Sequence, residues 1–316
     1  MSEFACLDDA YLWVIDAILS RGERVAPRTI PTSELRAIQF TVADPRRRYI
    51  SLVPRRWSFG YALGEFCWHA RGSDRLDEIS FYSERWGQMS DDGVTIRGSS
   101  YGAQIFRVQH ASKSQWMQVK ETLKSDGASR RAIFEFSDRN QRDPLRGRDM
   151  NCATALQFLV RGGRLEAIAT MRSNDVILGM PYDIFLFTML QEMMAVDLNL
   201  DVGPYHHFAG SMHIYDSNLA WSRDIVASHP SINEPMPQMH TLKGINQLLE
   251  GESETRTGAL PHHVDDSYWN DLLSVLVLRN ADHLHRPLDA NWRIASNLYK
   301  ELMRLRVSGE SVRAPL

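Results

Sequence analysis

The sequence predicts an α+β fold, and three neighbouring segments carry that prediction. Residues 153–160 and 165–171 are apolar enough to be buried strands and are joined by a Gly-Gly turn. Residues 205–215 alternate with the period of about two that a half-buried strand has. Between these strands, a long apolar stretch opens at Pro181, a residue favoured in the first turn of a helix.

The link between the second strand and this helix is predicted to bind an anion. Arg172-Ser173-Asn174-Asp175 is expected to form a turn ahead of the helix. A guanidinium and a hydroxyl at a helix start suit a phosphate group, because backbone N–H groups point outward there. The Gly162-Gly163 pair is interpreted as a hairpin turn instead, since no helix follows it.

The rest of the chain is predicted to consist of further helices, one more strand and loops. Asp8 and Asp9 are expected to cap a helix that Gly22 ends, and Ser58 a helix that runs through Ala70. Further helices are predicted at residues 115–125, around 265–278 and around 289–307, a strand at 132–137, and loops at 23–31, 82–101, 228–238 and 251–263.

Composition and charge are those of an ordinary soluble protein. The 316 residues are enough for one large domain or two small ones. A net charge of −3 and a longest basic run of Arg46-Arg47-Arg48 predict neither a nucleic-acid nor a membrane partner. No apolar run reaches the length of a membrane span and no leader pattern opens the chain, so a cytoplasmic location is expected. Three cysteines without a CxxC pair predict neither a disulfide framework nor a zinc site.

Several short motifs follow one another between residues 8 and 218. The strongest are Arg130-Arg131, Cys152, Gln157-Phe158, the run RSNDVILGMPYD from Arg172 to Asp183 and the run GSMHIY from Gly210 to Tyr215. Weaker matches occur at Arg28, Glu65 and Tyr101-Gly102. In this order and at these spacings, the motifs resemble the thymidylate synthase superfamily, and most closely its deoxycytidylate (dCMP) 5-hydroxymethylases.

The resemblance implies an architecture. It implies the thymidylate synthase fold, with a large mixed β-sheet flanked by helices and a homodimer that packs through its sheets. Residues 1–316 would form a single domain of this kind, with a divergent, mainly helical part from about residue 219. Arg130 and Arg131 are expected to reach across the dimer interface to the partner's phosphate, as in the family. Taken alone, two arginines before a strand are more often surface charges.

Cys152 is the predicted nucleophile. A pyrimidine C5 attacks a one-carbon electrophile only after a thiolate has added to C6, and this is why the chemistry needs a cysteine. A free thiol has a pKa of about 8.5, so a cation such as Arg172 is expected to make Cys152 more acidic. Taken alone, a cysteine before a strand is more often an inert core residue. Asn151 and Ala153 flank it where the commonest family pattern is Pro-Cys-His.

Asp183 is the predicted reader of the base. Uracil-specific members of the family hold an asparagine at this position, whose amide can donate to O4 and accept from N3–H. A carboxylate can accept from the N4 amino group of cytosine, and also from N3–H once N3 is protonated in the covalent adduct. The alternative is an aspartate that merely complements the helix dipole.

The resemblance also assigns the remaining site residues. The nucleotide is assigned to Arg28, Arg130, Arg131, Arg172, Ser173, Asp183, His213 and Tyr215, catalysis to Cys152, Glu65, Tyr82 and Tyr101, and the folate to Glu65, Tyr82, Asp175 and Gly179. Synthases usually carry a tryptophan where Tyr82 falls, and Trp86 lies close enough to be the equivalent residue instead. Without the resemblance, Arg28 reads as part of a solvated loop, and Glu65 as an exposed helix residue or a buried acid with a raised pKa.

These assignments predict a transferase of nucleotide biosynthesis that needs no metal. The adjacent His206 and His207 would point to opposite faces of a strand and could not easily share one ion. The expected reaction converts dCMP, 5,10-methylenetetrahydrofolate and water to 5-hydroxymethyl-dCMP and tetrahydrofolate. Tyr82 in place of tryptophan, with Glu65 to position a water, favours this product over a methyl group.

Several alternatives stay open at this stage. Arg130 and Ser173 favour dCMP over CMP, but a CMP 5-hydroxymethylase and a synthase that methylates dCMP or dUMP remain alternatives. An inactive nucleotide-binding regulator is the alternative outside enzymes. The presence of Cys152, Arg172 and Glu65 disfavours it.

Overall fold

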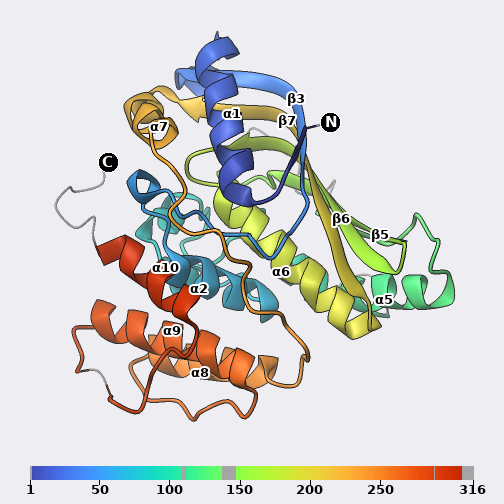
Figure 1. Cartoon of the computed structure of the whole chain (residues 1–316), viewed down its shortest axis with the longest axis vertical. Coiled ribbons are helices and arrows are strands. Elements are labelled where there is room, and N and C mark those ends of the chain that lie inside the picture. The colour runs from blue at the N-terminus through green and yellow to red at the C-terminus, as the bar shows by residue number, and fades with distance from the viewer. Residues whose placement is uncertain (1, 109–111, 137–146, 288, 308–316) are drawn as a thin grey trace.

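A mixed β-sheet forms the centre of the molecule (Figure 1). The computed structural model describes residues 2–108, 112–136, 147–287 and 289–307. Within them, the sheet has the strand order β1-β3-β7-β6-β5-β4, with β2 beside β3. β1 runs parallel to β3 and β6 parallel to β7, whereas the other neighbours are antiparallel. The strands are β1 (Ser2–Phe4), β2 (Glu23–Val25), β3 (Thr32–Val42), β4 (Ile133–Glu135), β5 (Ala153–Arg161), β6 (Arg164–Asp175) and β7 (Asp201–Tyr215).

The predicted hairpin is confirmed. β5 and β6 are antiparallel, and Arg161 pairs with Arg164 at the end of the hairpin. Gly162 and Gly163 have φ values of 56° and 74°, a region that favours glycine. The Gly-Gly pair is therefore turn chemistry, as expected from the absence of a following helix.

The predicted turn at residues 172–175 is wrong, because β6 continues through Asp175. Its last residues pair in parallel with β7, Ser173 with Ser211 and Asp175 with His213. This pairing between segments far apart in sequence keeps the backbone extended. The arginine and serine of the expected phosphate site therefore lie on a strand and not at a helix start.

Helices surround the sheet and carry most of the remaining core. They are α1 (Leu7–Arg21), α2 (Phe59–Ala70), α3 (Leu76–Ser80), α4 (Tyr101–Phe106), α5 (Gln115–Ser125), α6 (Met180–Leu198), α7 (Leu219–Val226), α8 (Ile245–Arg256), α9 (Ser267–His283) and α10 (Asn297–Val307). Short 3₁₀ turns occupy Pro27–Thr29, Val53–Arg55, Glu84–Gln88 and Asp216–Asn218. In the described part of the chain, no helix is long and apolar enough to cross a membrane.

The predicted N-terminal cap is confirmed for helix α2 and is wrong for helix α1. Ser58 Oγ accepts a hydrogen bond from the backbone N–H of Tyr61 and so caps α2. At α1, Cys6 occupies the cap position and Asp8 lies one residue inside the helix. Asp8 is buried, and its carboxylate accepts hydrogen bonds from Ser51. A tertiary contact thus takes the oxygen that a cap would use.

Four other expectations are tested by the described elements. The helix predicted around residues 289–307 is wrong before Asn297, where α10 begins. The strand predicted at 132–137 is β4, and residue 137 lies outside the described residues. The predicted loop at 23–31 contains β2, which forms only through its pairing with β3. The predicted loop at 251–263 is wrong up to Arg256, because α8 runs that far. Gly251 allows this, since a Cβ there would lie 2.8 Å from Leu273 of α9.

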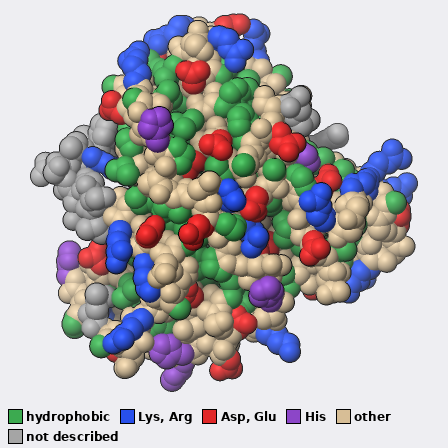
Figure 2. All heavy atoms as spheres, in the orientation of Figure 1, with side chains coloured by type: hydrophobic (Ala, Val, Ile, Leu, Met, Phe, Trp, Pro, Cys, Tyr) green, Lys and Arg blue, Asp and Glu red, His purple; other side chains and the backbone are tan. Residues whose placement is uncertain are grey.

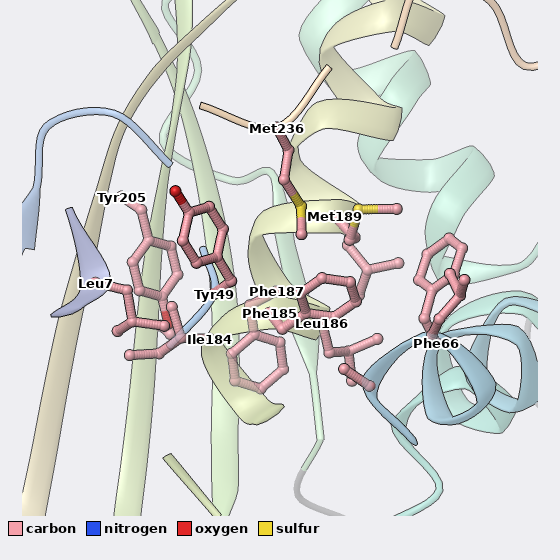
Figure 3. Packing of buried hydrophobic residues seen from close by; sticks show 14 of the residues in the cluster. Leu7, Tyr49, Phe66, Ile184, Phe185, Leu186, Phe187, Met189, Tyr205 and Met236 are labelled. Carbon is pink, nitrogen blue, oxygen red and sulfur yellow. The ribbon is translucent and has the colours of Figure 1, made fainter. Parts of the chain in front are cut away.

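Helix α6 lies between the sheet and helix α2 and is buried on almost every side. Its buried positions include runs of neighbouring residues rather than one stripe, as in a helix at the centre of a core. Figure 3 shows Phe185 and Phe187 between Tyr205 on the sheet side and Phe66 of α2. Such packing fixes the first turn of α6, which carries Asp183.

The C-terminal helices pack around α2 at the end of the molecule opposite α1 (Figure 1). Glu252 of α8 is buried there and accepts hydrogen bonds from Tyr82 and Arg71. On the face drawn in Figure 2, side chains of both charges are interspersed with hydrophobic ones.

A buried ion pair between Arg48 and Glu192 of α6 joins this helix to the chain before α2. Both side chains are 1% exposed, and Glu192 Oε1 also accepts from the backbone N–H of Met239 at 2.9 Å. Arg48→Met should lower the free energy of unfolding by about 3–5 kcal/mol, because it leaves a carboxylate buried without its cation. Urea denaturation would measure this.

The double variant Arg48→Met/Glu192→Leu is the control for this pair. It removes both charges and should recover part of the lost stability. A double variant no more stable than Arg48→Met would show that the loss comes from packing and not from the stranded charge.

Candidate active site

Cys152 stands immediately before β5, where that strand begins to pair with β6. The backbone N–H of Arg172 donates to the carbonyl of Cys152 at 2.8 Å. The next residue, Ala153, donates its N–H to the hydroxyl of Tyr101 at 3.1 Å. The backbone that carries the thiol is thus fixed at the start of β5 by one bond to β6 and one to the Tyr101 side chain.

The loop before Cys152 is fastened from two sides. The Arg172 guanidinium donates from Nε to the carbonyl of Asn151 at 2.8 Å and from Nη2 to that of Met150 at 2.9 Å. The Asp149 carboxylate accepts the backbone N–H groups of Gly98 and Ser99 at 2.7 and 2.8 Å. The carbonyl of Asn151, the residue before Cys152, thus helps to orient Arg172, whose charge acts on the thiol.

The thiol of Cys152 is less acidic here than the sequence led us to expect. Burial raises its pKa to about 11, and this effect outweighs the lowering by the Arg172 guanidinium. The carboxyls of Asp183, Asp149 and Asp175 raise it further. Arg172 therefore acts on the thiol in the predicted direction, but in the protein without its ligands the thiol is not made more acidic overall, since burial cannot be read from the local sequence.

Two carboxyl groups face this region, one from α6 and one from α2. Burial raises the pKa of Asp183 to about 7, although Asn174 Nδ2 donates to its Oδ2 at 2.8 Å. Burial raises the pKa of Glu65 to about 8, and the Asp183 carboxyl adds to the shift. Of the two alternatives for Glu65, an exposed helix residue or a buried acid, the structure shows the buried acid. Glu65 and Asp183 both hold protons near neutral pH.

Glu65 is oriented by two aromatic side chains. The Tyr61 hydroxyl donates to Glu65 Oε1 at 3.0 Å, and Trp86 Nε1 donates to the Tyr61 oxygen at 3.0 Å. Tyr61 lies one turn before Glu65 on α2, and Trp86 comes from the 3₁₀ turn at Glu84–Gln88. Tyr61 was not among the predicted residues, although its i, i+4 spacing to Glu65 is a usable signal.

Tyr82 lies between α2 and α8 and does not bond Glu65. Its ring packs on α2 so closely that a Cβ on Gly64 would lie 2.2 Å from it. Its hydroxyl donates to Glu252 of α8 at 2.8 Å, and the Arg279 guanidinium covers the ring at 4.5 Å. The structure therefore brings Trp86, rather than the Tyr82 hydroxyl, into the hydrogen-bond network of Glu65.

The ends of β6 and β7 bring further predicted residues together. Asp175 is paired with His213, and its Oδ1 accepts the backbone N–H groups of residues 177 and 178 at 2.8 and 3.2 Å. The His213 and Tyr215 rings meet edge to face at 5.1 Å. Gly179 stands before α6, where a Cβ would lie 3.3 Å from Asp183 Oδ2.

The arginines predicted for the phosphate fall in two groups. Arg28 lies in the turn at Pro27–Thr29 with a φ of 51°. Burial raises the pKa of Tyr215, and the charge of Arg28 opposes that rise. Arg130 and Arg131 are exposed ahead of β4, and Gln157 donates to the carbonyl of Arg130 at 2.9 Å. Gln157 is five residues along β5 from Cys152, roughly 17 Å. One chain therefore does not bring this pair to its own thiol.

Two of the histidines have separate environments. His207 is buried and lies 3.1 Å from Asn174 Oδ1. His206 bonds Thr41 and lies 3.5 Å from a Glu166 oxygen, on the other face of β7. Among the described residues, no group of three His, Cys, Asp or Glu side chains is arranged to hold a metal ion.

Comparison with known proteins agrees with this geometry. The family model described as thymidylate synthase matches residues 9–252. The chain belongs to the thymidylate synthase family. One relative, named deoxyuridylate hydroxymethyltransferase, comes from Bacillus phage SP01. It is 26% identical over 271 residues, which are 76% of this chain and 70% of that protein. As a thymidylate synthase family member, the chain is a folate-dependent one-carbon transferase that acts on a nucleotide.

A pH-dependent stability follows from the Glu65 geometry. Its pKa is raised, so the folded protein keeps a proton that the unfolded chain loses near pH 4. The free energy of unfolding should therefore fall as pH rises from about 4 to 8, and Glu65→Gln should remove about 2–4 kcal/mol of that fall. Urea denaturation of both proteins at pH 5 and pH 9 would measure the difference, and parallel pH curves would contradict it.

Proposed function

We propose that this enzyme adds a hydroxymethyl group to C5 of dCMP, with methylenetetrahydrofolate as donor and water as the final nucleophile. The observation that carries the choice of base is Asp183, which stands where uracil-specific relatives hold an asparagine. Its Oδ2 accepts a hydrogen bond from Asn174, and its other oxygen is left for a ligand. The named activity of the phage relative supports the hydroxymethyl product, while its uracil base differs from the one proposed here.

The first step joins the thiol to the base. Cys152 Sγ, after losing its proton, forms a bond to C6 of the pyrimidine. The electron pair of the C5–C6 double bond moves to C4–C5, and that of C4–N3 moves to N3, which takes a proton. Asp183 supports this step, because its carboxyl can give the N3 proton and accept from the N4 amino group.

The binding groups lie around that reaction centre. Arg172 acts electrostatically on the thiol and Arg28 on Tyr215, and these two arginines would hold the phosphate. Ser173, His213 and Tyr215 lie at the ends of β6 and β7 and would contact the phosphate and sugar edge.

We assign the folate to Asp175 and to aromatic residues near Arg55. The donor supplies its one-carbon unit as an electrophile for C5. A large aromatic ring system needs flat partners, and the half-buried rings of Tyr182 and Trp221, which lie 5.5 and 5.4 Å from the Arg55 guanidinium, would contact its edge. Asp175 is within electrostatic reach of that guanidinium and would accept from the folate ring.

Glu65 supports water as the last nucleophile. After the folate leaves, the exocyclic methylene on C5 takes either a hydride, giving a methyl group, or water. Glu65 has one oxygen fixed by Tyr61, so in the ionised fraction of the enzyme its other oxygen can orient a water and accept the proton of that water. Tyr101 lies beside Cys152 and would assist removal of the C5 proton.

Product masses test the proposal directly. The enzyme is incubated with methylenetetrahydrofolate and, separately, dCMP, CMP and dUMP, while dihydrofolate is followed by absorbance. A gain of CH₂O on dCMP without dihydrofolate is expected. A gain of CH₂ with dihydrofolate would mean a methylating synthase, and turnover of CMP or dUMP alone would overturn the proposed sugar or base.

We also infer a single-domain homodimer with shared sites, acting in the cytoplasm. The sheet face turned away from α6 carries half-buried side chains such as Ile168 and Phe208, which suit a second sheet. Such packing could bring Arg130 and Arg131 to the partner's phosphate.

A mixing experiment tests the shared site. Neither Arg130→Ala nor Cys152→Ala chains should be active alone. An equal mixture, unfolded and refolded together, should regain about a quarter of wild-type activity, since half the dimers are mixed and each has one complete site. No recovery, with mixed dimers present by native mass spectrometry, would show that Arg130 does not act across the interface.

A further inference from the structure

A chain of hydrogen bonds lies behind Asp183. Asn174 Nδ2 donates to Asp183 Oδ2 at 2.8 Å, and Asn174 Oδ1 lies 3.1 Å from His207 Nε2. On the other side of the same imidazole, Nδ1 lies 3.0 Å from the Tyr205 hydroxyl. Asn174, His207 and Tyr205 come from β6 and β7 and are 2%, 1% and 0% exposed. They form what we call the Tyr205–His207–Asn174 chain.

The buried phenol gives this chain one direction. Within the described residues, His207 is the only hydrogen-bond partner of the Tyr205 hydroxyl. A buried hydroxyl that fails to donate is costly, so Tyr205 donates to Nδ1. Burial lowers the pKa of His207 to about 3, and the neutral ring then carries its proton on Nε2. Nε2 donates to Asn174 Oδ1, which turns the amide nitrogen toward Asp183.

The direction of the chain decides which oxygen of Asp183 can carry a proton. Oδ2 accepts from Asn174, and the C=O oxygen of a protonated carboxyl is a better acceptor than its O–H oxygen, so the proton of the acid form is favoured on Oδ1. A protonated carboxyl presents one donor and one acceptor to a base. Cytosine needs a donor opposite N3 and an acceptor opposite its N4 amino group, whereas uracil needs an acceptor opposite N3–H and a donor opposite O4. Moving the proton to the other oxygen would therefore exchange the cytosine pattern for the uracil pattern.

We propose that Tyr205, His207 and Asn174 are positioning residues that fix the donor and acceptor oxygens of Asp183 and thereby its discrimination between cytosine and uracil. This inference rests on the proposed base reading by Asp183. Other groups facing that carboxyl are Glu65 of α2, Asp175 of β6, Tyr101 of α4 and Cys152 before β5. In the described part of the chain, none of these donates a hydrogen bond to Oδ2.

The test is the ratio of kcat/KM for dCMP to kcat/KM for dUMP. Tyr205→Phe removes one oxygen and frees the tautomer of His207, so the ratio should fall roughly tenfold. His207→Leu breaks the chain and should lower the ratio at least as much. His207→Gln can accept from Tyr205 and donate to Asn174, so it should restore the ratio.

A matched control separates positioning from general damage. Tyr49 is also a buried tyrosine, and its hydroxyl donates to the carbonyl of Glu234 at 2.6 Å. Tyr49→Phe loses one buried hydrogen bond but should leave the ratio unchanged. The ¹⁵N signals of His207, identified by their loss in His207→Gln, should show the proton on Nε2.

The outcomes separate this inference from the proposed function. An unchanged ratio in Tyr205→Phe and His207→Leu, while Asp183→Asn shifts it, would overturn the positioning role and leave the base reading intact. A proton on Nδ1 of His207 would overturn the direction of the chain. A ratio that even Asp183→Asn leaves unchanged would overturn both the base reading and the role of the chain. If His207→Leu does not fold, Tyr205→Phe and His207→Gln still decide.

Discussion

Cys152→Ala should abolish turnover, with kcat/KM lowered by on the order of 10⁴-fold or more. Without the thiolate, C5 does not become nucleophilic, and no other described residue offers a thiol to the same pocket, since Cys6 and Cys67 are buried in the core. A nucleotide with fluorine at C5 traps the covalent complex, because fluorine cannot leave as the proton does. Intact mass should therefore show nucleotide and folate bound to the wild type and to none of the Cys152→Ala protein.

The matched control for the nucleophile is Cys6→Ala, which removes a different thiol of raised pKa. That variant should keep the adduct and the turnover. An adduct on Cys152→Ala would place the nucleophile elsewhere. The raised pKa of Cys152 further implies that the thiolate fraction of the ligand-free enzyme rises with pH toward the alkaline side.

Local patterns were enough for the hairpin, α2, α5 and the start of α6. Each is signalled by neighbours in sequence: the Gly-Gly turn, the Ser58 cap, the amphipathic pattern of residues 115–125, and Pro181 at the head of an apolar run. Strand β3 carries no such signal. Ala37 has a φ of 53° and interrupts its alternation, so the strand is defined by its antiparallel pairing with β7.

The sequence was enough to name the candidate site residues but not to predict their pKa values. The motifs named Cys152, Glu65 and Asp183 before their burial was known. Their pKa values depend on groups brought together from α2, α6 and the sheet, and desolvation outweighs the charges that local sequence suggests. His207 was considered only as a metal ligand, because its contact with Asn174 joins residues 33 positions apart.

Asp183→Asn should shift the preference of the enzyme from dCMP toward dUMP. The amide can donate to O4 and accept from N3–H of uracil, whereas it leaves the N3 proton of the cytosine adduct without a source. Sites built to hydrogen-bond a substrate reject a mismatched one strongly, so the ratio of kcat/KM for dCMP to dUMP should fall by about 10²- to 10⁴-fold. Parallel kinetics with both nucleotides at pH 7 would measure it.

Asp197→Asn is the control on the same helix, since Asp197 lies near the other end of α6 and binds Lys120 and Trp116. It perturbs a carboxylate of α6 without touching the base and should leave the ratio unchanged. Two results would count against the base reading by Asp183: retained cytosine preference in Asp183→Asn, or a fall in dCMP turnover with no gain for dUMP.

Because the pKa of Asp183 is raised to about 7, the asparagine variant should also lose the part of the dCMP pH profile that this acid contributes near neutrality. A profile unchanged by the substitution would mean that another group supplies the N3 proton, and the cytosine pattern would then have to be read elsewhere in the pocket.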